Sequence, residues 1–104
     1  MIHELKELPL YFDAVANGSK TFELRRGDRD FHIGDFIALN EWTERDGYTG
    51  RALLARITYM LYIDRIIGAN TGYVVLSIER VAVVDAARGP LSLDNLRPEV
   101  ETNG

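Results

Sequence analysis

The stretch that decides the fold is Gly18-Ser19-Lys20-Thr21-Phe22-Glu23-Leu24-Arg25-Arg26. Side chains on a strand alternate between its two faces, so Phe22 and Leu24 share one face and Glu23 and Arg25 share the other. This alternation predicts a strand over 20–26. We expect its apolar face to pack against a core and its charged face to present a functional site.

The segments around this strand indicate a mainly β chain. Alternating or β-branched runs predict four further strands, at 2–7, 36–42, 51–62 and 73–81, the last extending to about 84. Pro9 suits the first turn of a helix and Gly18 a helix end, which predicts a helix over about 9–17. Asp46-Gly47 indicates a hairpin between two of the strands, and 63–71 is expected to be a connection.

These elements predict a mainly β (α+β) fold with one or two short helices. In a chain of 104 residues they favour a closed or nearly closed small β-barrel, because closure hides the sheet edges. We expect one domain over 1–84. Residues 85–104 then form a C-terminal extension, partly docked through its leucines and disordered at its end: Leu91, Leu93 and Leu96.

Composition narrows the class of protein. The formal net charge is −4, which argues against a domain that grips a long phosphate backbone but permits a local basic site. Cysteine is absent, which excludes disulfides and thiolate metal sites, and the two histidines lack a pattern of acidic ligands around them. We expect a cytoplasmic protein with no signal peptide, membrane span, metal or cofactor. The oligomeric state is not defined by these features.

Lys20 and Glu23 form the sharpest candidate pair. A carboxylate can activate water while an ammonium stabilises a developing oxyanion, and hydrolysis of an amide needs both. Thr21 is a candidate nucleophile because it neighbours Lys20 and can share the face of Glu23. Spacing alone favours the alternative of a structural ion pair at the start of a strand.

Further side chains are candidates for binding a substrate. Arg25 and Arg26 lie on opposite faces of the predicted strand, so one of them is expected to enter a cleft and bind a carbonyl, phosphate or base edge. Lys6 approaches from the first predicted strand. Four aromatic residues are candidates for stacking on a base, with packing in the core as the alternative: Trp42, Tyr59, Tyr62 and Tyr73, of which Trp42 and Tyr73 are our choice.

The order and spacing of these motifs resemble a known family. Gly18–Arg25 matches the G-x-K-x-x-E-x-R signature of ASCH domains, which belong to the PUA-like superfamily. The chain is similar to small ASCH-like domains of unknown function in bacteria and phages over about 2–80. The resemblance rests on seven segments: His3–Lys6, Lys20–Arg25, Asp28–Phe31, Gly34-Asp35, Tyr48–Arg51, Ile57–Tyr59 and Gly72–Ile78.

The resemblance implies a PUA-like barrel with a cleft that binds RNA or nucleosides. Some small ASCH proteins resemble amidohydrolases that remove the acyl group of N4-acylated cytidine, with the motif lysine, a threonine and a downstream glutamate as catalytic residues. Lys20 and Arg25 match that pattern, but Glu23 stands where the threonine is expected. The connection that would carry the downstream glutamate is shorter here, and its only acid is Asp64.

Two functions therefore follow from the sequence. The first is a small amidohydrolase for N4-acylated cytidine or a similar nucleoside, in which Glu23 activates water or Thr21 and Lys20 stabilises the oxyanion. The alternative is a non-catalytic RNA-binding module. The acidic chain favours the neutral substrate, because a net charge of −4 repels a long polyanion.

Overall fold

The computed structural model describes residues 1–85, which form five strands and two short helices. Their order is β1 (Ile2–Glu7), α1 (Pro9–Ala16), β2 (Phe22–Arg26), β3 (Phe36–Thr43), β4 (Gly47–Tyr62), α2 (Asp64–Ile67) and β5 (Tyr73–Asp85). The prediction of a mainly β chain with one or two short helices is confirmed.

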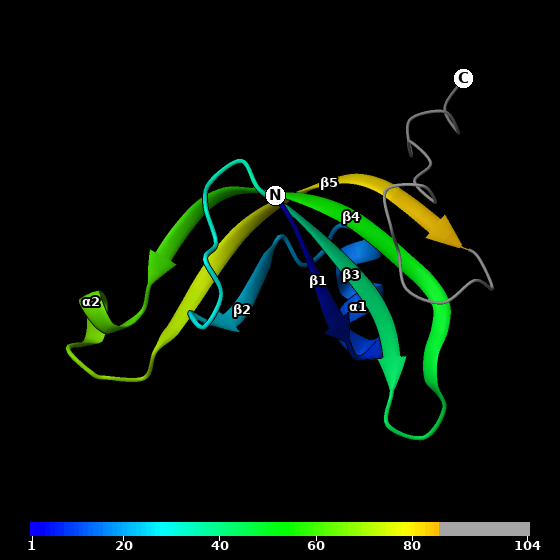
Figure 1. Cartoon of the computed structure of the whole chain (residues 1–104), viewed down its shortest axis with the longest axis horizontal. Helices are drawn as coiled ribbons and strands as arrows, with labels where there is room; N and C mark the ends of the chain where they lie inside the picture. Colours follow the sequence, from blue (N-terminus) through cyan, green and yellow to red (C-terminus); the bar gives the residue numbers. More distant parts are fainter. Residues whose placement is uncertain (86–104) are drawn as a thin grey trace.

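All five strands of the described residues belong to one sheet, in the order β1-β3-β4-β5-β2. β1 runs parallel to β3, and the other neighbours are antiparallel. The sheet curls into a half-barrel (Figure 1), and its outer strands β1 and β2 are not neighbours in the sheet. Backbone pairing therefore leaves the half-barrel open between these two strands.

The main core lies between the sheet and α1, which sits inside the curl (Figure 1). Phe12 and Val15 of α1 are buried, and they join a cluster of strand residues that includes Ile37, Leu39, Leu53 and Leu76. Alternate residues of the strands form a second, smaller cluster: Ala38, Ala52, Leu54 and Ala82. β3 is thus buried on both faces, which explains why its first residues are almost continuously apolar.

The starts of two strands differ from the predictions by two residues or more, and one helix was not predicted. β2 begins at Phe22, two residues late, because the Lys20 backbone N–H donates to the Ala14 carbonyl at 3.0 Å, near the end of α1. β4 begins at Gly47 and follows the turn directly. The connection over 63–71 contains α2, a single helical turn that ends at Gly68 with a φ of 66° and was not predicted.

The β3–β4 hairpin is confirmed and provides a prediction about stability. Thr43 pairs with Gly47, whose φ of 75° lies in the left-handed region that favours glycine. A Cβ at this position would meet no heavy atom within 4 Å, so Gly47→Ala tests the backbone alone. We expect a loss of about 1 kcal/mol in the free energy of unfolding, measured in urea. Gly47→Asn should recover most of it, because asparagine tolerates this conformation, and equal losses for both variants would contradict the explanation.

The sequence analysis also made predictions about the C-terminal extension, the domain limits and membrane-spanning segments. The C-terminal extension and its docking leucines lie outside the described residues, and the proposed domain limits of 1–84 and 85–104 stay predictions. Within residues 1–85, neither helix has the length and apolar character needed to cross a membrane.

Candidate functional site

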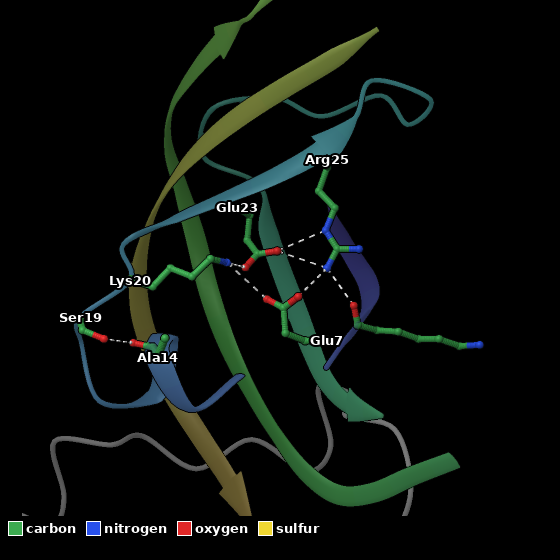
Figure 2. Close-up of polar contacts among 7 residues, drawn as sticks. Glu7, Ala14, Ser19, Lys20, Glu23 and Arg25 are labelled. Atoms are coloured by element: carbon green, nitrogen blue, oxygen red, sulfur yellow. Dashed lines mark hydrogen bonds and ion pairs between the residues drawn. The ribbon is translucent and has the colours of Figure 1, made fainter. Parts of the chain in front are cut away.

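Four ionisable side chains meet in the opening between β1 and β2, and we call them the Glu–Lys–Arg cluster: Glu7, Lys20, Glu23 and Arg25. The Glu23 carboxylate lies at its centre (Figure 2). Lys20 Nζ donates to Glu23 Oε1 at 2.5 Å, while Arg25 Nε donates to Glu23 Oε2 at 3.2 Å. The structure therefore brings together three of the residues that the sequence motif singled out.

Glu7 enters the cluster from β1. Arg25 Nη2 lies 3.2 Å from Glu7 Oε1 and donates to the Lys6 carbonyl at 2.8 Å, while Lys20 Nζ lies 3.7 Å from Glu7 Oε2 (Figure 2). Arg25 belongs to β2, at the other edge of the sheet. Its side chain thus links the two edges that the backbone leaves unpaired.

The end of α1 positions Lys20 at the cluster. Asn17 caps the helix, and its Oδ1 accepts a hydrogen bond from the Ser19 backbone N–H at 2.8 Å. The Ser19 hydroxyl donates to the Ala14 carbonyl at 3.2 Å (Figure 2). These short contacts fix the path of the chain between α1 and β2, so Lys20 reaches the carboxylates from the helix side.

The two faces of β2 are inverted relative to the prediction. Glu23 is 1% exposed and points into the half-barrel, whereas Phe22 and Leu24 are 47% and 49% exposed. The alternation was right, but the expectation that Phe22 and Leu24 face the core was wrong. The charged face can lie inside because Glu23 and Arg25 find partners there, which offsets the cost of removing them from water.

The pKa values of the two glutamates in the cluster are shifted in opposite directions. Burial, followed by a hydrogen bond to Glu23 and repulsion from it, raises the pKa of Glu7 to about 8. Burial also works to raise the pKa of Glu23, but hydrogen bonds with Glu7 and Lys20 prevail and lower it below its usual value. At neutral pH Glu7 is therefore a protonated acid beside an ionised Glu23, and two cations face one carboxylate.

A pocket opens beside the cluster, and we call it the apolar-rimmed pocket. It has a volume of about 590 Å³ and is lined by Lys6, Glu7, Leu8, Tyr11, Lys20, Phe22, Glu23, Leu24 and Arg25. The rings of Tyr11 and Phe22 lie 5.7 and 5.2 Å from Lys20 Nζ. A planar ligand can contact these rings while its polar end reaches the cluster.

The other predicted site residues lie around the cluster or apart from it. Thr21 is exposed and precedes β2, and it lines a different pocket with Ile78 and Glu79. Lys6 and Arg26 stack on the two chosen aromatic residues, with Lys6 Nζ 4.5 Å from the Trp42 ring and Arg26 4.8 Å from the Tyr73 ring. Neither aromatic residue lines the apolar-rimmed pocket.

Sequence reasoning missed Glu7 and Tyr11 as site residues and assigned Phe22 to the core. The alternation of β1 could have indicated Glu7, because side chains two positions apart share a face and Leu5 is buried. Glu7 therefore points inward as well, and a buried glutamate needs a partner. The sequence does not show which residue is the partner, because Arg25 lies 18 positions away.

Asp64, the one acidic residue in the connection between β4 and β5, forms hydrogen bonds within that connection. Its Oδ1 accepts hydrogen bonds from the hydroxyl and backbone N–H of Thr71, at 2.6 and 2.8 Å, and its Oδ2 accepts one from the Gly72 N–H at 2.8 Å. These bonds lower the pKa of Asp64, beginning with the Thr71 hydroxyl. Among residues 1–85, no three histidine or acidic side chains gather in a way that could hold a metal ion.

The fold and the site together define a small β protein with two buried glutamates and two cations in the opening between its outer strands. The chain belongs to the family described as "Domain of unknown function (DUF3850)", which it matches over residues 2–78. It is also similar to the "Uncharacterized 12.9 kDa protein in GpA 3'region" of Escherichia phage P2, at 46% identity over 57 residues. That match covers 55% of this chain and 51% of the relative, so the chain spans about half the length of the phage protein.

Proposed function

We propose that the protein is a small cytoplasmic amidohydrolase that removes the acyl group of N4-acylated cytidine or a similar modified nucleoside. The observation that carries this proposal is the pair of glutamates with opposed pKa shifts, next to Lys20 and open to the apolar-rimmed pocket. Two carboxyl groups whose environments separate their pKa values suit an acid and a base in one reaction. The proposal includes membership of the ASCH group in the PUA-like superfamily, with which the curled sheet is compatible.

In the first step of this mechanism, Glu23 acts as the general base. Its carboxylate takes a proton from a water molecule, whose oxygen attacks the acyl carbonyl carbon. The carbonyl becomes a tetrahedral oxyanion, which Lys20 stabilises with its ammonium group. With Glu7 neutral, the cluster holds two cations and one anion, so its net positive charge favours the negative charge that develops.

In the second step, Glu7 acts as the general acid. The bond between the acyl carbon and the exocyclic nitrogen breaks, and the proton of Glu7 passes to the leaving nitrogen to give the amine of cytidine. The acyl group leaves as a carboxylic acid. A proton shift from Glu23 to Glu7, which has the higher pKa, then restores the starting state. Arg25 holds both carboxyl groups in place during this exchange.

The test of the proposal is direct hydrolysis. The protein is incubated with N4-acetylcytidine and with the butyryl and benzoyl analogues, and the release of cytidine is followed by chromatography. We expect catalytic turnover of at least one of these amides. If none of the three is hydrolysed at high enzyme concentration, the amidohydrolase proposal is wrong.

The pH dependence of turnover is a second prediction. Glu23 must be ionised and Glu7 protonated, so kcat/KM should be level through neutral pH. As the pH rises through about 8, Glu7 loses its proton and kcat/KM should fall by about tenfold per pH unit. The Glu7→Gln variant, which cannot lose this proton, should be less active and should lack the descending limb. A rate that keeps rising from pH 8 to pH 10 would contradict the assignment of Glu7 as the acid.

The alternative function, an RNA-binding module without chemistry, makes a different prediction about salt. Binding to a polyanion weakens steeply as salt is added, because it releases condensed counterions, whereas turnover of a neutral nucleoside changes little. The formal net charge of −4 favours a small substrate over a long polyanion. An oligonucleotide titration at two salt concentrations separates the two functions.

A further inference from the structure

A second pocket is also lined by residues of β1 and β2, and we call it the basic pocket. It has a volume of about 470 Å³, and its lining includes four cations and two carboxylates: Lys6, Arg25, Arg26, Arg29, Glu4 and Asp28. Lys6 and Arg25 line both pockets, so the two are contiguous at these residues.

The basic pocket gathers cations that lack a carboxylate partner. Of the ten lysines and arginines within residues 1–85, four form no ion pair, and three of these four line this pocket: Lys6, Arg26 and Arg29, with Arg65 outside it. Lys6 and Arg26 are instead held against the faces of Trp42 and Tyr73. In an acidic chain, so many unpaired cations around one pocket indicate a site for an anion.

We propose that the basic pocket binds the 5′-phosphate of the substrate, so that the protein acts on a nucleoside monophosphate in preference to the free nucleoside. This inference rests on the proposed function for the base and its acyl group, which occupy the apolar-rimmed pocket. The sugar then lies over Lys6 and Arg25, which line both pockets, and the phosphate accepts hydrogen bonds from Arg26 and Arg29.

The number and placement of cations in the basic pocket suit a phosphate monoester better than a long RNA strand. The pocket presents three cations without an ion pair, Lys6, Arg26 and Arg29, which suits a single phosphate group. Among the described residues away from this pocket, Arg65 is the cation that likewise stacks on a tyrosine without an ion pair, 5.5 Å from the Tyr62 ring. The basic surface is therefore local, whereas a polyanion needs a continuous row of cations along its backbone.

Calorimetry with unmodified ligands tests the inference without relying on turnover. Cytidine 5′-monophosphate should bind the wild-type protein at least about tenfold more tightly than cytidine, because charged hydrogen bonds to phosphate are added. In the double variant Arg26→Ala/Arg29→Ala this ratio should fall to about one, with the affinity for cytidine unchanged. Arg65→Ala removes a similarly stacked arginine outside the pocket and should leave the ratio unchanged.

Four results would overturn the inference. They are a wild-type ratio near one, no measurable binding of the monophosphate at millimolar concentration, a ratio that survives the double variant, or an equal loss in Arg65→Ala. An oligocytidylate that binds more tightly than the monophosphate would replace the monoester by an RNA phosphodiester. Failure of the amidohydrolase assay together with a tenfold ratio that depends on Arg26 and Arg29 would refute the proposed reaction but leave the phosphate site standing.

Discussion

The Glu23→Gln variant should lose turnover of N4-acetylcytidine by about 10²- to 10⁴-fold in kcat, because an amide cannot take the proton of the attacking water. The substitution preserves the shape of the side chain, but its amide has one acceptor oxygen, so it keeps a hydrogen bond from either Lys20 or Arg25 and loses the other. We therefore expect a lower thermal unfolding temperature together with the loss in kcat, and a KM that changes little by comparison. Steady-state kinetics together with circular dichroism of the purified variant measure these effects.

A matched control separates the site from a general effect of removing a carboxylate. Glu79 is an exposed glutamate on β5 that pairs with Arg56 at 2.7 Å, and Glu79→Gln should keep wild-type turnover. If Glu23→Gln turned over substrate at more than a tenth of the wild-type rate, Glu23 would not be the base. The cluster would then have the role that spacing alone favoured, a structural ion pair.

Strand order and burial show why the sequence predicted the positions of the strands better than which face of β2 is buried. The alternation over 22–26 was read correctly, because a period of two is a local property of the chain. Which face turns inward depends on what lies across the half-barrel. Phe22 and Leu24 are more hydrophobic than Glu23 and Arg25, so local reasoning placed them in the core. Glu7 on β1 lies there and pairs with Arg25, so the face of β2 that carries Glu23 and Arg25 turns inward.

The candidate site was predicted in part for the same reason. Lys20, Glu23 and Arg25 fall within one short motif, and the chemistry of a carboxylate beside an ammonium could be stated from their spacing. Glu7 could not be assigned, because its raised pKa depends on burial and on the nearness of Glu23. Tyr11 was likewise missed, because only the folded chain places its ring near Lys20 Nζ, at 5.7 Å.

The Arg25→Met variant should be destabilised by roughly 2–4 kcal/mol in the free energy of unfolding at pH 8. Removing one partner of a buried charge pair leaves the other uncompensated, which typically costs 3–5 kcal/mol. We expect somewhat less, because the Arg25 side chain is 24% exposed. Glu7 and Glu23 would remain buried, with Lys20 as the one cation left in the cluster. Urea unfolding measures the effect, and the same substitution at the exposed Arg56 should cost no more than about 1 kcal/mol.

The pH dependence of this loss identifies its cause. The pKa of Glu7 is raised on folding, so its contribution to stability is fully present below about pH 4.5 and is lost as the pH rises through about 8. Arg25 lowers the pKa of both glutamates, so in its absence each carboxyl holds its proton to a higher pH. The deficit of Arg25→Met should therefore be small at pH 5 and largest above pH 8. A deficit that is the same at both pH values would mean that Arg25 stabilises the half-barrel by packing, and that charge does not hold β1 and β2 together.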